Sequence, residues 1–96
     1  MNSPTPAPES VCAEADRLVS TDRGRQYGSP SENFAATARI WEVVLKLPTG
    51  SITSEQVGLC MIGLKLAREA FQHKRDSLTD ICGYAKTVEM VHDERP

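Results

Sequence analysis

The sequence has no long apolar run, and no stretch approaches the roughly 20 residues that a membrane-spanning helix needs. Its first residues lack the basic and apolar segments of a signal peptide. Lysine and arginine number 11 against 13 acidic residues, and they form none of the basic blocks that nucleic-acid binding usually requires. We therefore expect a cytoplasmic protein without a DNA, RNA or membrane partner.

Motifs of the commonest enzyme classes are also missing. The chain has no Walker loop, GxGxxG, GxSxG or HExxH motif. Cys12, Cys60 and Cys82 stand far apart without metal-ligand spacing, so we interpret them as reduced core residues. His73 and His92 have neither a nearby nucleophile nor a second ligand at metal-like spacing. On these grounds we expect no resident cofactor.

What the sequence does contain is helical periodicity of apolar residues in four segments. These segments begin near residues 9, 30, 54 and 76 and end near residues 21, 47, 71 and 91. Ser29, Thr53 and Asp76 stand where N-caps belong, and Pro30 occupies a first helical position. The pattern predicts an all-α, four-helix, bundle-like domain over residues 9–92, between a disordered proline-rich leader, residues 1–8, and a charged tail, residues 93–96.

The third predicted helix is apolar over most of its circumference. Its main apolar face carries Val57, Met61 and Phe71, whereas Trp41, Val44 and Leu45 belong to the predicted buried face of the second helix. A helix of this kind belongs in the centre of an assembly, and a 96-residue chain buries only a modest core. We therefore expect the bundle to be completed by homo-oligomerisation.

Charged residues interrupt this apolar helix in an unusual place. Lys65 and Arg68 lie inside its apolar zone, while Asp76, Asp80 and Tyr84 are spaced by four along the last helix. A tight turn would pack the two helices antiparallel and bring these residues within reach of one another. The cluster is either an ion pair that fixes helix register or a site for a phosphate-bearing small molecule or a metal.

The connection between the first two helices carries a second candidate site. Its sequence, DRGRQYGSPSENF, combines glycine, proline, arginine and tyrosine. Arg23 and Arg25 are candidate phosphate ligands, and Tyr27 could stack or hydrogen bond beside the following helix start. The alternative interpretation is an ordinary turn with solvated arginines.

The segments RGRQYGSPSENF, GLKLAREA and DSLTDICGYAK together resemble an uncharacterised family of small tailed-phage and prophage proteins. The matching positions are Arg23, Gly24, Tyr27, Gly28, Lys65, Leu66, Ala67, Arg68, Asp76, Asp80, Gly83, Tyr84 and Ala85. The resemblance implies a phage-encoded protein of the host cytoplasm. A more distant similarity to all-α, MazG-like nucleoside triphosphate pyrophosphohydrolases implies a magnesium site, for which Asp76 and Asp80 would be ligands.

These observations lead to three hypotheses of function. The first is a nucleotide or phosphate-ester binder without robust catalysis, which uses Arg23, Arg25, Tyr27, Lys65, Arg68, Asp80 and Tyr84. The second is a MazG-like, Mg²⁺-dependent enzyme, in which Lys65 and Arg68 stand where the first acidic pair is expected. The third is a module that binds a host protein or acts as a scaffold.

Overall fold

A computed structural model of the chain describes residues 8–23 and 29–94, and its regular elements are all helical. They are α1 (Val11–Arg17), a π-helical continuation η1 (Leu18–Arg23), α3 (Pro30–Leu45), α4 (Ser54–Phe71) and α5 (Arg75–Asp93). The all-α prediction is confirmed. Residues 1–7 of the predicted leader and the loop residues 24–28 lie outside the described part. None of the described helices has the length and apolar character needed to cross a membrane.

Local capping chemistry explains where α3 and α4 begin. Ser29 accepts a hydrogen bond from the backbone N–H of Glu32 at 3.2 Å, and Pro30 opens the helix. Thr53 and Gln56 form a reciprocal capping box, with bonds of 2.9 and 3.1 Å. The predicted starts of these two helices are therefore correct.

The start of α5 differs from the prediction. Lys74, not Asp76, is the N-cap, and its side chain makes no capping bond. The Glu69 carboxylate accepts the N–H of Lys74 at 2.8 Å and also contacts His73. Because Glu69 fixes the turn in this way, the helix begins before Asp76, which falls in the first turn.

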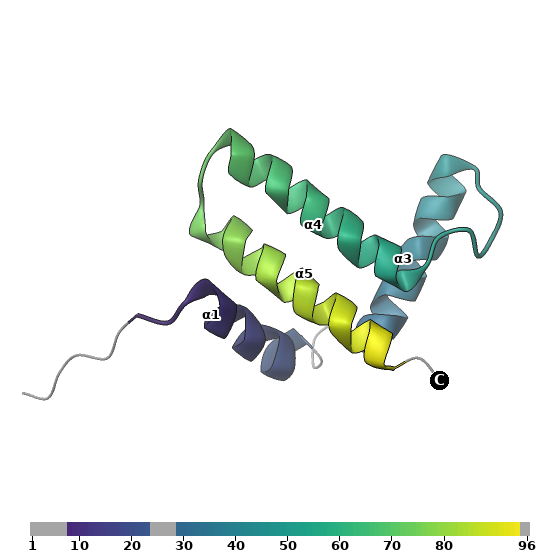
Figure 1. The fold of residues 1–96 in the computed structure, drawn as a ribbon. Helices are drawn as coiled ribbons and strands as arrows, with labels where there is room; N and C mark the ends of the chain where they lie inside the picture. The colour runs from purple at the N-terminus through teal and green to yellow at the C-terminus, as the bar shows by residue number, and fades with distance from the viewer. Residues whose placement is uncertain (1–7, 24–28, 95–96) are drawn as a thin grey trace, which may run out of the picture.

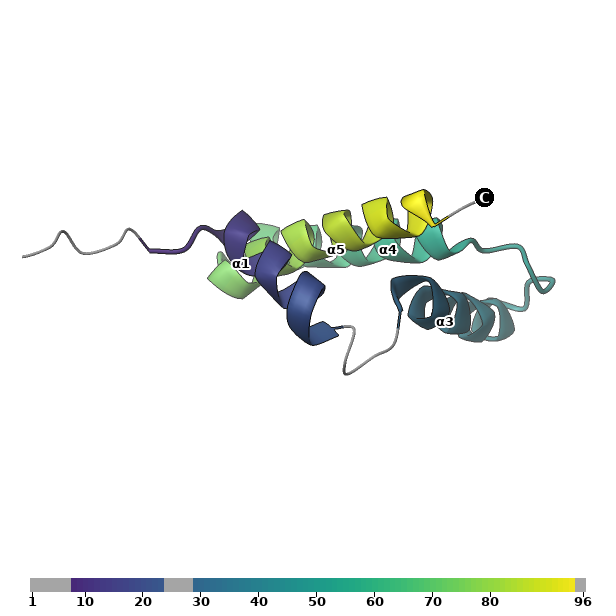
Figure 2. The same cartoon turned by 90° about the horizontal axis from the view of Figure 1, so that it is seen from below.

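α5 is the central helix of the fold. α4 and α5 lie antiparallel and side by side, α1 flanks α5 on the side away from α4, and α3 crosses where α4 begins and α5 ends (Figure 1, Figure 2). α5 contacts every other helical element. The expectation that the third helix, α4, would be central is wrong for the single chain, because α4 lies at the edge of the three-helix layer.

The buried core lies where α3 crosses the α4–α5 pair. Phe34, Ala38, Val57 and Val91 form it, with Trp41, Ile52, Met61 and Tyr84 packed around them. Gly58 permits the close approach of these helices. A Cβ atom there would collide with Val88 Cγ2 and lie 2.9 Å from Phe34 Cε2.

The second half of α3 extends beyond the α4–α5 pair (Figure 1). Val44 and Leu45, which the periodicity assigned to a buried face, are 71% and 60% exposed. That assignment is wrong because a helix that crosses its neighbours steeply contacts them over only part of its length. The exposed apolar side chains of this half are Ile40, Val43, Val44 and Leu45, and Leu47 follows just past the end of the helix.

Glu42 ties the end of α3 to the following loop. Its buried carboxylate accepts hydrogen bonds from Arg39 and from the backbone N–H groups of Gly50 and Ile52, at 2.6 to 3.0 Å. Burial by itself raises the pKa of Glu42. The bonds from Ile52, Arg39 and Gly50 outweigh it, so the pKa lies below its ordinary value of 4.5.

Candidate functional site

A pocket of about 680 Å³ lies between the second half of α4 and the start of α5. It brings together four residues that the sequence marked as site candidates: Lys65, Arg68, Asp76 and Asp80. The remaining lining residues are Leu64, Ala67, Phe71, Gln72, Lys74 and Ser77. The antiparallel packing of α4 on α5 places these two sets of charges opposite each other.

Lys65 and Asp80 form an ion pair across the pocket. Lys65 Nζ lies 2.9 Å from Asp80 Oδ2, with the lysine side chain 17% and the aspartate side chain 45% exposed. Because water reaches the carboxylate, the pair adds little to stability, about 1 kcal/mol at most. The pair holds the lysine ammonium against the Asp80 carboxylate.

Two further cations line the same pocket. Within residues 8–23 and 29–94, the side chains of Arg68 and Lys74 make no ion pair. Lys74 precedes α5, whose first turn also lines the pocket through Asp76 and Ser77. A helix start carries partial positive charge on its free N–H groups. This end of the pocket therefore favours an anion, although Asp76 partly offsets the charge.

Phe71 adds an aromatic surface at the rim. It is the last residue of α4, and it is 90% exposed. An exposed phenyl ring beside cations can stack on a planar ring while the cations hold an attached phosphate. The apolar spacing placed Phe71 on a buried face, and neither Phe71 nor Lys74 was predicted as a site residue. The available signal was an aromatic residue at the end of an apolar stripe, followed directly by the polar segment QHKR, which contains Lys74.

The other candidate ligands lie elsewhere or are not described. Tyr84 packs with the core, its ring centroid 6.5 Å from that of Phe34. Arg23 is the last residue of η1, and its side chain lies outside the described part, as do Arg25 and Tyr27. Their roles as phosphate ligands stay predictions.

The residues of the pocket do not fit a magnesium site. Mg²⁺ is usually bound through carboxylates together with substrate phosphates. Here the Lys65 ammonium contacts Asp80, and Glu69 is engaged by His73 and by the Lys74 N–H. Across the described ranges, no group of three or more Asp, Glu, His or Cys residues could hold a metal ion. We therefore derive no metal-dependent step at Asp76 and Asp80.

Comparison with known proteins places the chain among phage sequences. The Gene 55 protein of Mycobacterium phage D29 is 38% identical over 87 residues, and that of Mycobacterium phage L5 is 33% identical over 91 residues. Each match covers 90% of this chain but only 56% of the relative, so the chain spans just over half of their length. No solved structure matches.

A family profile matches residues 10–92, nearly all of the helical domain. The prediction of a phage-derived family without an assigned function is thereby confirmed. The similarity to MazG-like enzymes stays a prediction. The chain belongs to the family described as domain of unknown function DUF6378.

Proposed function

We propose that this domain binds a nucleotide or another phosphate-bearing small molecule in the α4–α5 pocket, in the cytoplasm of the infected host cell. The observation that carries the proposal is the combination of Arg68 and Lys74 with the exposed ring of Phe71 along one pocket. A phosphate group and a nucleobase need these two kinds of contact.

The charges indicate how such a ligand would lie. The planar guanidinium of Arg68 can donate two parallel hydrogen bonds to phosphate oxygens, and Lys74 adds a flexible charge at the start of α5. The base would then stack on Phe71. Asp76 and Asp80 reduce the positive charge of the pocket, so we expect moderate affinity that falls as salt is raised.

The proposal predicts that Arg68→Gln and Lys74→Gln each weaken ATP binding about tenfold, the loss expected for one charge-assisted contact. Phe71→Ala should weaken ATP binding and leave inorganic pyrophosphate binding unchanged, because only ATP carries a base. Isothermal titration calorimetry at low salt, with EDTA present, measures both. Lys46→Gln removes an equal charge from the surface at the end of α3 and should bind as the unmodified protein does.

Two results would contradict this function. One is a titration in which neither ATP nor pyrophosphate gives a binding heat. The other is that the Arg68, Lys74 and Lys46 variants all bind ATP with the same affinity. Adding Mg²⁺ and measuring phosphate release tests the enzymatic hypothesis in the same samples, and we expect no appreciable turnover. Arg23→Gln and Arg25→Gln in this assay test the predicted contribution of the loop.

We also propose that the domain forms a homodimer through the exposed half of α3. The surface of Ile40, Val43 and Val44 follows one stripe of α3 and is 62% to 78% exposed; Leu47, just past the end of the helix, is 43% exposed. Glu42 on the same stretch is buried, so its charge would not face a second copy of this surface. A self-complementary contact of this kind closes as a two-fold dimer.

Light scattering at micromolar concentration should therefore give the mass of a dimer, and Val43→Lys should give a monomer by burying a charge in the contact. Ala13→Lys adds the same charge at an exposed position of α1, which does not pack on α3, and should leave the dimer intact. A monomer whose mass does not change with concentration would contradict the homodimer. It would leave the host-protein or scaffold hypothesis for this surface.

A further inference from the structure

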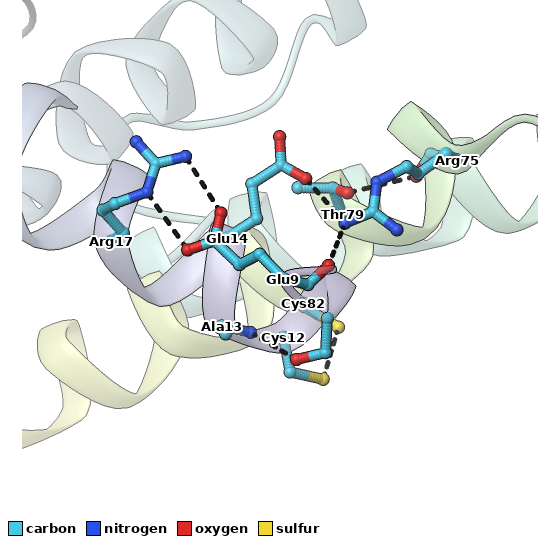
Figure 3. Close-up of polar contacts among 9 residues, drawn as sticks. Glu9, Cys12, Ala13, Glu14, Arg17, Arg75, Thr79 and Cys82 are labelled. Atoms are coloured by element: carbon cyan, nitrogen blue, oxygen red, sulfur yellow. Dashed lines mark hydrogen bonds and ion pairs between the residues drawn. The ribbon is translucent and has the colours of Figure 1, made fainter. Parts of the chain in front are cut away.

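Two cysteines from distant parts of the chain meet on the surface between α1 and α5. The Sγ atoms of Cys12 and Cys82 are 3.1 Å apart, although the residues are 70 positions apart in sequence. Figure 3 shows the two sulfur atoms facing each other. Both are free thiols, and a disulfide would require the sulfur atoms to approach by about 1 Å.

Several contacts hold Cys12 in this place. Arg75 donates to the carbonyl oxygen of Glu9 at 2.7 Å and to the Glu14 carboxylate at 3.0 Å, and Lys86 pairs with Asp16. Glu9 precedes Cys12 in the sequence, whereas Glu14 and Asp16 follow it; the two contacts of Arg75 can be followed in Figure 3. The sulfur atoms are therefore brought together by the packing of α1 on α5, before any bond forms between them.

The two thiols differ in access. Cys12 is exposed, whereas Cys82 is half-buried behind it. The hydrogen bond with Cys12, followed by burial, raises the pKa of Cys82, which keeps that sulfur protonated. The interpretation of all three cysteines as core residues is wrong, because Cys12 and Cys60 are exposed.

We propose that Cys12 and Cys82 form an oxidation site that closes to a disulfide in the presence of a disulfide-class oxidant such as oxidised glutathione. The Cys12 thiolate attacks oxidised glutathione, forms a mixed disulfide and releases one glutathione thiolate. The Cys82 sulfur, as its proton leaves to solvent, then attacks Cys12 Sγ and releases the second glutathione. The protein loses two protons and two electrons, and one oxidised glutathione becomes two reduced molecules.

The bond would fasten α1 to the central helix. A crosslink between positions so far apart restricts the unfolded chain strongly, which stabilises the folded state. It would also hold Glu14 beside Arg75, next to the residues that begin α5 at the pocket. The oxidised protein should therefore resist unfolding and keep α1 in place.

The test uses the full chain with Cys60→Ser, so that the exposed thiol of Cys60 cannot react. After incubation with oxidised glutathione, the intact mass should fall by two hydrogens, both thiols should disappear in a titration, and Tm should rise by about 10 °C. Adding a reductant should reverse all three changes. Cys12→Ser and Cys82→Ser in the same background are the matched controls, and each should give a stable glutathione adduct or no reaction.

The proposal would be overturned if the Cys60→Ser protein gave a glutathione adduct, a disulfide-linked dimer or no change in mass. An internal disulfide with an unchanged or lower Tm would contradict the inference that the bond stabilises the packing of α1 on α5. Because the readouts are mass, thiol content and Tm, they are independent of nucleotide binding.

Discussion

Gly58→Ala is expected to lower the free energy of unfolding by about 2 kcal/mol, the typical cost of forcing an extra methyl group into a packed core. Alanine favours the helix by about 1 kcal/mol over glycine, so the clash must exceed that gain. The new Cβ would meet Val88 Cγ2 and the Phe34 ring. The valine side chain is short and stiff in a helix, and the ring is buried, so neither can move away cheaply. Urea denaturation followed by circular dichroism measures the change.

Gly63→Ala is the matched control, because it makes the same substitution in the same helix. Among the described residues, and apart from its chain neighbours and the backbone of its own helix, no atom lies within 4 Å of the position where its Cβ would be. The substitution should change the free energy of unfolding only through helix propensity, which raises it by up to about 1 kcal/mol. Equal effects at the two positions would show that α4 does not approach α3 and α5 as closely as described.

Glu42→Gln is expected to lower Tm by roughly 5 to 10 °C at neutral pH, because one substitution weakens every bond to the buried carboxylate. The amide retains one oxygen, but its NH₂ group would face the N–H donors of Arg39, Gly50 or Ile52. The loop after α3 should loosen first. Differential scanning calorimetry measures the shift in Tm.

The pH dependence gives the Glu42 prediction a second readout. The folded-state pKa of Glu42 is depressed below 4.5, so its contribution is present above pH 4.5 and is lost as pH falls through the folded value. Tm of the unmodified protein should therefore fall in this acidic range more steeply than Tm of Glu42→Gln. Glu89→Gln, at an exposed position of α5, should retain the steep fall. Parallel curves for Glu42→Gln and the unmodified protein would contradict the role of this carboxylate.

Local chemistry made the helices predictable from sequence. Apolar spacing reflects the helical repeat, and Ser29 and Thr53 act on N–H groups only a few residues away. The start of α5 was missed because Glu69, in the preceding helix, supplies a bond to Lys74. The side chain that determines where α5 begins therefore lies outside the residues that flank the start of this helix.

Packing angles between helices were beyond the reach of the sequence pattern. Periodicity shows which side chains share a face of α3, but not how much of that face another helix covers. Val44 therefore appeared buried when it is exposed. The meeting of Cys12 with Cys82 depends in the same way on how α1 lies against α5.

The candidate site was predictable in part. Spacing by four and an antiparallel turn were enough to place Lys65 opposite Asp80. The exposure of Phe71 was not predictable, because apolar spacing does not show whether a neighbouring helix covers the last turn of α4. The contributions of Arg23, Arg25 and Tyr27 to ligand binding stay predictions.

The central position of α5 also determines the order in which the native structure can form during synthesis. α1, α3 and α4 leave the ribosome before the helix on which all of them pack. Until residues 75–93 emerge, α1 lacks its native partner α5, and α3 and α4 can pack only on each other, so the complete core must wait for α5. A nascent chain stalled before α5 should bind chaperones and be cleaved readily by protease.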